Sequence, residues 1–216
     1  RHYDLDRIRS VDLLVSYWMG PAIAHTLVSF GFDDGRHVTF SVEIRKERGE
    51  AFSTLGGFFK EYEVSIIAAD ERDIVRLRTN VRGEDVYLYR VKMSKPVMQD
   101  LFLAYLDEAH RLQREPRYYN TLTTNCTTLV YDMMRRIVPG LPFDYRLLLS
   151  GYLPEYVHSV GALAPHVPFA RLKAAGHINA RALQADDGED FSARIRWGIP
   201  GADAPSYDMN DRNMKD

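Results

Sequence analysis

Two strand-like runs joined by a turn decide the fold, and they read AIAHTLVSFGF-DDG-RHVTFSVEIR over residues 22–45. The Asp-Asp-Gly turn at 33–35 is typical of a β-hairpin. Even-numbered residues of both runs are mostly apolar, whereas odd-numbered residues are mostly polar. Side chains alternate between the two faces of a strand. The apolar residues of both strands therefore share one face, and the polar residues the other, only in some registers. A three-residue loop at 33–35 gives such a register and places His25 opposite Glu43 as a cross-strand neighbour.

Further strands and helices surround this hairpin. The patterns predict strands at 64–69 and 85–92, a possible helix at 50–61, and helices at 71–79 after Asp70, 96–113 after Ser94, 127–138 and, with an interruption, 145–160. Helices around a mostly antiparallel sheet predict an α+β fold. We expect one domain over residues 1–184 and a polar C-terminal tail over residues 185–216.

Composition narrows the class of protein. The chain has 216 residues, a net charge of −2 and 45% hydrophobic residues, which is ordinary for one globular domain. It shows no basic footprint for nucleic acid and no apolar run long enough to span a bilayer. Because it starts at Arg1 without Met, we expect a processed or truncated product that lacks an upstream anchor. The oligomeric state cannot be read from the sequence.

Cys126 is the one cysteine, and it follows a polar loop and begins an apolar helix. Unpaired N–H groups and the helix dipole at such a position favour a thiolate. The backbone N–H groups of Cys126 and Thr127, helped by Asn125, are candidates to hold an oxyanion. The alternative is that Cys126 is a small hydrophobic residue packed in the first helical turn. One cysteine and scattered histidines have no metal-ligand spacing, so we expect no metal and no cofactor.

A cysteine nucleophile needs a base, and the base needs an orienting group. Of the seven histidines, His25 has the best context, because it lies in mid-strand with Glu43 opposite. We therefore predict Cys126 as nucleophile, His25 as base and Glu43 as the orienting residue. The alternative for the hairpin is a solvated sheet face with an incidental His–Glu pair. The chain order His, Glu, Cys reverses the papain order, as a circular permutation would.

Three blocks carry a resemblance to a known family: Ala24–Arg36, Ser41–Glu47 and Thr124–Thr128. Together they resemble the Lnb N-terminal periplasmic domain family, over about residues 3 to 160. The family pattern has Gly-His-Thr where this chain has Ala24-His25-Thr26. The resemblance implies a permuted papain-like (NlpC-type) thiol enzyme in which His25 and Cys126 are the family's histidine and cysteine. It also implies a place at the periplasmic face of the bacterial inner membrane.

The resemblance further implies acyl transfer, because one class of members moves an acyl chain from phospholipid to the N-terminal cysteine of lipoproteins. The expected partners are phospholipid, lipoprotein and the membrane surface. We expect Arg45, with Lys46 and Arg48, to meet lipid phosphates, and Tyr119 and Asn120 to shape the site. Phe52, Leu55, Phe58 and Phe59 could line an apolar groove. The alternatives are that these four residues belong to the core, that the basic residues form a solvated charge run, and that Tyr119 and Asn120 pack the loop.

Two other classes of function stay open. A cysteine peptidase or amidase acting on cell-wall peptides would have a polar cleft that is open to water. A non-catalytic periplasmic binding domain would keep its function when Cys126 is replaced by serine. The identities of acyl donor and acceptor, and the choice between transferase and hydrolase, depend on access to the thioester, which the sequence does not display.

Overall fold

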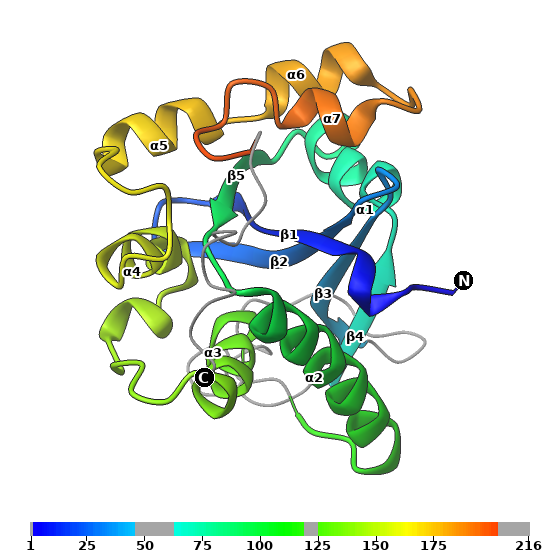
Figure 1. Ribbon diagram of the computed structural model, residues 1–216, viewed down its shortest axis with the longest axis vertical. Coiled ribbons are helices and arrows are strands. Elements are labelled where there is room, and N and C mark those ends of the chain that lie inside the picture. Colours follow the sequence, from blue (N-terminus) through cyan, green and yellow to red (C-terminus); the bar gives the residue numbers. More distant parts are fainter. Residues whose placement is uncertain (1, 46–62, 119–124, 203–216) are drawn as a thin grey trace, which may run out of the picture.

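The computed structural model describes residues 2–45, 63–118 and 125–202. Its centre is a five-stranded antiparallel sheet in the order β4-β3-β2-β1-β5, with helices on both faces (Figure 1). The strands are β1 (Ile8–Met19), β2 (Ile23–Phe32), β3 (His37–Arg45), β4 (Glu63–Ala69) and β5 (Asp85–Val91). This architecture confirms the predicted α+β class, while the papain-like relationship stays a prediction from the resemblance.

The β2–β3 hairpin has the predicted register. Leu27 lies opposite Ser41 and Gly31 opposite His37. Gly35 closes the turn at φ +80°, a conformation that glycine adopts without the steric cost of a Cβ atom. The hairpin thereby brings the odd-numbered residues of both strands to one face of the sheet.

Strand β1 was not predicted, although it is an interior strand of the sheet, between β2 and β5. It pairs with β2 on one side, where Leu13 lies opposite Val28, and with β5 on the other, where Leu13 lies opposite Tyr89. Its even-numbered positions include Asp12 and Ser16, and both are fully buried. Polar side chains at these positions resemble a solvated face in the sequence, but in the structure they are buried and hydrogen-bonded.

The helices divide between the two faces of the sheet. The elements are η1 (Leu5–Arg7), α1 (Glu71–Arg76) with a π-helical turn η2 (Leu77–Val81), α2 (Lys95–Arg114), α3 (Cys126–Ile137), η3 (Tyr145–Leu147), η4 (Ser150–Tyr152), α4 (Leu153–Ser159), α5 (Phe169–Gly176), α6 (Asn179–Ala185) and α7 (Phe191–Ile195). Helices α2 and α3 pack on one face, where Phe40 stacks on Tyr105 at 4.7 Å between ring centroids. Helices α1, α6 and α7 cover the other face around Leu14 and Leu27. The possible helix at 50–61 lies outside the described residues.

The region expected to be a polar tail is folded up to residue 202. In α7, Phe191 and Ile195 are fully buried. Arg196 reaches β1 and α1, where it bonds Asp12 Oδ2 at 2.9 Å and Glu71 Oε2 at 2.8 Å. The domain boundary at residue 184 is thus corrected, because a few apolar residues and one buried arginine dock an otherwise polar segment. Residues 203–216 lie outside the described residues.

Candidate active site

His25 and Glu43 lie together on the face of the sheet that their register predicts. The His25 Nε2 atom is 3.1 Å from Glu43 Oε1 and 2.6 Å from Ser41 Oγ. The Ser41 hydroxyl in turn donates to Glu43 Oε1 at 2.6 Å. With the Ser41 proton used in this way, the Nε2 atom acts as a donor, and Nδ1 is left as the basic nitrogen of a neutral ring.

Three side chains, His25, Ser41 and Arg78, stabilise the ionised form of Glu43. Burial alone would raise the pKa of Glu43, but His25, Ser41 and Arg78 together lower it to about 2. The Arg78 guanidinium is almost fully buried and donates to Glu43 Oε1 and to Glu84 Oε2, each at 2.9 Å. Glu43 is therefore ionised at neutral pH and can orient and stabilise a protonated His25.

The hydrogen-bond network of Glu43 extends to β1. Ser16 lies opposite His25 in the β1–β2 register, and its hydroxyl donates to Glu84 Oε2 at 2.5 Å. Ser16, Glu84 and Arg78 connect β1 to the carboxylate that contacts His25. Among them, Arg78 comes from the π-helical turn after α1, so a local irregularity of that helix positions the guanidinium.

Cys126 is the first residue of α3, as expected. Asn125 is the N-cap, and its side-chain oxygen accepts hydrogen bonds from the amides of Thr127 and Thr128 at 2.9 and 2.8 Å. The Thr128 hydroxyl accepts from the Asn125 amide at 2.9 Å, which completes a capping box. The capping box thus stabilises the N-terminus of α3 and fixes where the thiol lies.

This cap corrects part of the expected oxyanion site. The Thr127 amide was expected to hold an oxyanion, but its proton is donated to Asn125 Oδ1 in the structure. Asn125 accepts at the cap through the same oxygen, so its role here is to build the helix terminus. Of the two expected backbone donors, the Cys126 amide is the one that remains.

The Cys126 thiol is buried, with 3% of the residue exposed. Its Sγ donates to the Ala24 carbonyl at 3.9 Å. Burial raises the pKa of the thiol, while hydrogen bonds from Thr26 and Thr127 act in the opposite direction. The expectation that the helix terminus yields a thiolate is therefore not met in this conformation, because desolvation outweighs the favourable hydrogen bonds.

Cys126 and His25 meet the same short stretch of β2 from different sides. The thiol contacts Ala24 and Thr26, which are the chain neighbours of His25. Because side chains alternate along a strand, the His25 ring leaves β2 on the face opposite to the Ala24 and Thr26 side chains. Within the described residues, no hydrogen bond joins the thiol to the ring, whose contacts are with Ser41 and Glu43.

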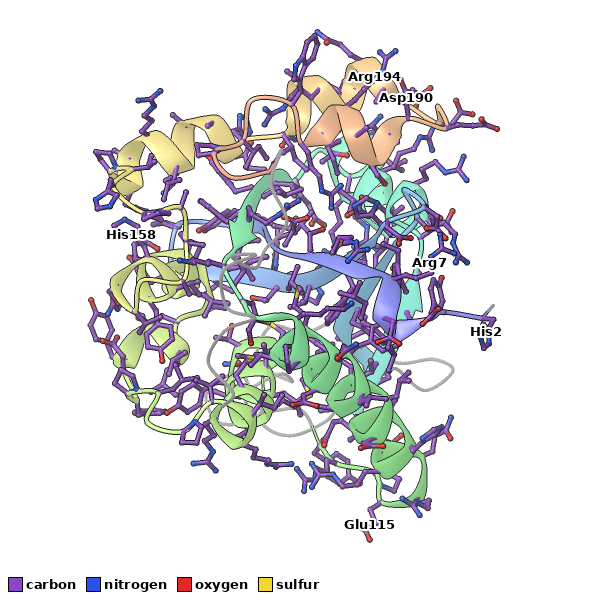
Figure 2. The ribbon with its side chains drawn as sticks, in the orientation of Figure 1. His2, Arg7, Glu115, His158, Asp190 and Arg194 are labelled. Atoms are coloured by element: carbon purple, nitrogen blue, oxygen red, sulfur yellow. The ribbon has the colours of Figure 1, made fainter. Side chains whose placement is uncertain are left out.

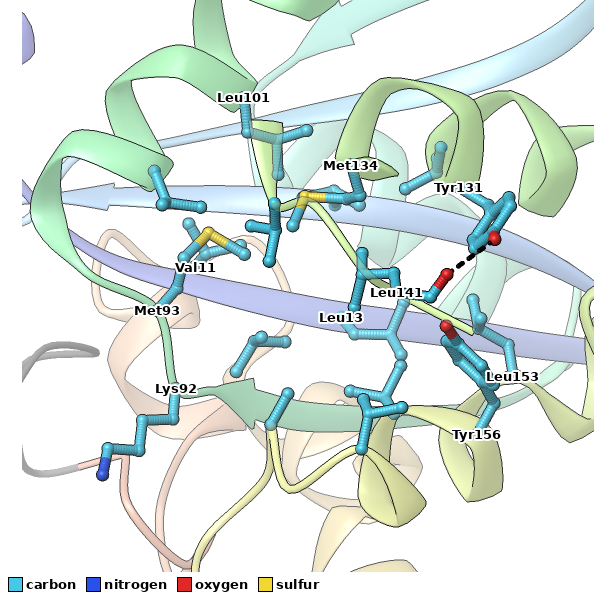
Figure 3. Close-up of a pocket in the computed structure, with 18 of the residues that line it drawn as sticks. Val11, Leu13, Lys92, Met93, Leu101, Tyr131, Met134, Leu141, Leu153 and Tyr156 are labelled. Atoms are coloured by element: carbon cyan, nitrogen blue, oxygen red, sulfur yellow. Dashed lines mark hydrogen bonds between the residues drawn. The ribbon is translucent and has the colours of Figure 1, made fainter. Parts of the chain in front are cut away.

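A cavity of about 380 Å³ lies beside α3, between the sheet, the start of α2, and α4 (Figure 3). Most of its lining residues are apolar. Thr127, the residue after Cys126, also lines the cavity. The Tyr131 and Tyr156 hydroxyls donate to the carbonyls of Leu141 and Pro142, at 3.0 and 2.8 Å. These bonds satisfy the two hydroxyl groups, so the aromatic rings present apolar surface to the cavity.

The comparison with known families decides the relationship. The Lnb N-terminal periplasmic domain family matches residues 1–151, which is more than half of the chain. The chain belongs to this family. No curated protein and no solved structure gives a significant match.

In this Lnb-type periplasmic domain, no helix of the described residues is long and apolar enough to cross a bilayer. Figure 2 shows His2 near the start of the chain, and His158 belongs to α4. His37 lies on β3 opposite Gly31 of β2, where its Nδ1 contacts the Gly35 carbonyl. His158 Nε2 is engaged with the Val167 carbonyl at 3.2 Å.

The structure does not test the remaining predicted site residues of the Lnb-type domain. Arg45 is the last residue of β3, opposite Glu63 on β4. Tyr119, Asn120, Lys46 and Arg48 lie outside the described residues, as does the expected groove of Phe52, Leu55, Phe58 and Phe59. The apolar cavity that the structure does describe is formed by other residues.

Sequence reasoning missed Ser41 and Arg78. Ser41 is on the polar face of β3, two residues before Glu43, so the alternation that indicated Glu43 could also have indicated Ser41. Arg78 comes from an element distant in sequence, and no spacing pattern connects it to the hairpin. The cavity was missed for a similar reason, because its walls come from separate elements that meet only in the folded chain.

Proposed function

We propose that this Lnb-type domain is a thiol acyltransferase in which Cys126 is the nucleophile, His25 the base and Glu43 the orienting carboxylate. The observation that carries the proposal is the His25–Glu43 pair at 3.1 Å on the stretch of β2 that the Cys126 thiol contacts. Covalent thiol catalysis requires a nucleophile, a base and an ionised orienting group, and here the base and its carboxylate lie on one face of a strand whose other face the thiol contacts.

The proposed reaction has two steps. His25 takes the proton of Cys126, and Sγ attacks a phospholipid ester carbonyl; a C–S bond forms, the ester C–O bond breaks, and His25 returns the proton to the lysophospholipid oxygen. The amine of a lipoprotein then attacks the thioester; a C–N bond forms, the C–S bond breaks, and the proton from the amine passes through His25 to the departing Cys126 sulfur. In the described conformation the thiol and the His25 ring lie on opposite faces of β2, so a local rearrangement of β2 around Ala24–Thr26 that brings the ring to the thiol precedes the first step.

The cavity favours a lipid over a peptide as the acyl donor. A peptidase or amidase would need a polar cleft for its amide substrate, since buried amides without partners are costly. The cavity beside α3, which Thr127 but not Cys126 lines, has mainly aliphatic and aromatic walls, which match an acyl chain. Phospholipid, lipoprotein and the periplasmic face of the inner membrane accordingly remain the proposed partners and location.

The first test is covalent capture of the acyl group. The protein would be incubated with phospholipid vesicles and its intact mass measured, alongside Cys126→Ala and His25→Ala. We expect a fatty-acyl mass on the unaltered protein that hydroxylamine removes, and no adduct on either variant. Adding a diacylglyceryl peptide with a free N-terminus should discharge the adduct onto that peptide.

Other outcomes separate the competing functions. If the protein binds the vesicles but forms no adduct, the acyltransferase proposal fails. Turnover of a cell-wall peptide that depends on Cys126 would then point to the peptidase class. Unchanged function of Cys126→Ser in cells would point to a non-catalytic role. Discharge of the thioester to water, with amine present, would identify a hydrolase.

A further inference from the structure

We propose that the cavity beside α3 is a binding site for one acyl chain, which extends along α3 from the Cys126 end. The direction of the chain rests on the proposed function, because it places the carbonyl near the thiol. The binding itself does not depend on any chemistry at Cys126. Figure 3 shows Met134 and Tyr131 of α3 above the space, with Leu13 and Leu153 facing it from other elements.

The cavity follows one face of α3. Thr127, Val130, Tyr131, Met134 and Val138 all line it and recur at helical spacing. At a rise of about 1.5 Å per residue, the path from Thr127 to Val138 is about 16 Å long. This is a length suited to a long alkyl chain, and it begins one residue after the proposed nucleophile.

The chemistry of the walls supports a hydrocarbon. Among the lining residues, the polar side chains are Lys92, Ser94, Thr127 and the two tyrosines. Lys92 is exposed, and the tyrosine hydroxyls are already bonded to backbone carbonyls. A polar ligand would find few partners in this space, whereas an alkyl chain needs none.

Exposed aromatic residues next to the cavity indicate that the chain comes from a lipid surface. Phe143 and Tyr145 are 64% and 65% exposed, and they follow Leu141, which lines the cavity. Aromatic side chains of this kind favour the boundary between water and membrane. We infer that this loop meets the bilayer and that the acyl chain passes from it into the cavity.

Binding can be measured in Cys126→Ala, where no thioester forms. A fluorescent fatty acid would be bound to this variant and displaced by unlabelled fatty acids of increasing chain length. We expect affinity to rise about fourfold per added methylene and to level off once the cavity is full. In the Cys126→Ala background, Val130→Trp should fill the cavity and weaken fatty-acid binding at least tenfold. Leu103→Trp, on the exposed side of α2, should leave binding unchanged.

A second variant keeps the test decisive if Val130→Trp does not fold. Met134→Ala enlarges the cavity, so the rise of affinity with chain length should continue beyond the point where the parent levels off. Affinity that is independent of chain length, or an unchanged plateau in Met134→Ala, would overturn the proposal. So would a folded Val130→Trp variant that binds like the Leu103→Trp control.

The source of the chain is tested separately. Vesicles of phosphatidylethanolamine and phosphatidylglycerol that carry the fluorescent fatty acid would be offered to Cys126→Ala with and without Phe143→Ser and Tyr145→Ser. We expect the double change to slow uptake from vesicles severalfold and to leave binding of the free fatty acid unchanged. Equal uptake would overturn the role of this loop. Binding without any thioester in the parent protein would overturn the proposed function and with it the direction of the chain, but the cavity would stand as an acyl-chain site.

Discussion

The guanidinium of Arg78 lies 2.9 Å from Glu43 Oε1, the same oxygen that is 3.1 Å from His25 Nε2. One carboxylate oxygen therefore faces a fixed cation on one side and the proposed base on the other. Arg78 is a positioning residue in this arrangement, because it acts on His25 through Glu43. It also joins Glu43 to Glu84, so two carboxylates depend on one buried cation.

Replacing Arg78 by Gln should destabilise the protein by about 3 kcal/mol at neutral pH, because it leaves partly buried carboxylates without their cation. Urea unfolding followed by circular dichroism measures this loss. Arg76→Gln is a matched control, since its partner Asp186 is exposed and surface pairs contribute little. Equal effects of the two substitutions would contradict the role given to Arg78.

The pH dependence of stability should differ between Arg78→Gln and the parent. The pKa of Glu43 is lowered from 4.5 to about 2 by folding. Its contribution to stability is therefore complete above pH 4.5 and is lost as the pH falls toward about 2. In Arg78→Gln the pKa of Glu43 should lie nearer its ordinary value, so less of the stability of the variant should disappear over this interval. Urea midpoints measured at intervals across it provide the check.

Removing the orienting carboxylate should affect the chemical step more than binding. We expect Glu43→Gln to lower the rate of thioester formation by about a hundredfold or more, with little change in affinity for a fatty acid. Rapid-quench mass spectrometry measures the rate. Ser65→Ala is the control, because its hydroxyl contacts the Glu43 backbone carbonyl rather than the carboxylate. A rate that is unaltered in Glu43→Gln would exclude an orienting role.

The buried thiol should react slowly with alkylating reagents. Because burial raises its pKa, alkylation of Cys126 by iodoacetamide should be much slower in the folded protein than in urea, and it should accelerate with rising pH. Thr26→Val removes a hydrogen bond that favours the thiolate, so it should slow the reaction further at a given pH. Intact mass against time measures both. Rapid alkylation at neutral pH would show that the thiol is already activated.

A buried ion cluster should hold the C-terminal segment. Arg196 bonds both Asp12 and Glu71, and all three are buried. Arg196→Met should cost about 3–5 kcal/mol, since two carboxylates would lose a buried partner. Arg194→Met, one turn away from its exposed partner Asp190, should change stability by less than about 0.5 kcal/mol. Thermal or urea unfolding of the pair compares them directly.

The parts of the site that depend on neighbouring residues in the sequence could be predicted. The parts that depend on contacts between separate elements could not. Alternation and a turn were enough to pair His25 with Glu43, and a polar loop before an apolar run was enough to locate Cys126 at a helix start. Strand β1 was missed because its polar residues are buried in ion pairs and hydrogen bonds rather than solvated. Arg78 was missed because its contact with Glu43 depends on how separate elements pack.

The correction at Thr127 has a different origin. A helix N-terminus in a sequence suggests free amides, but the side chain of Asn125 occupies two of them. Whether an N-cap satisfies its own helix or leaves the amides to a ligand depends on one side-chain rotamer. Asn125 at the N-cap, with Thr128 three residues later, is itself the signal in the sequence that these amides are satisfied by their own helix.

The docking of α7 shows that the extent of sequence similarity and the extent of the folded unit differ in this protein. The family match ends at residue 151, whereas the hydrophobic cluster under α6 and α7 continues to Ile199. A fragment cut at the end of the match would lose α6 and α7 and keep only α1 over Leu14, Leu27 and Leu88 on that face of the sheet. It would also strip Asp12 and Glu71 of their shared cation. The unit to express, truncate or fuse is therefore set by Arg196, well beyond the last residue at which the family can be recognised.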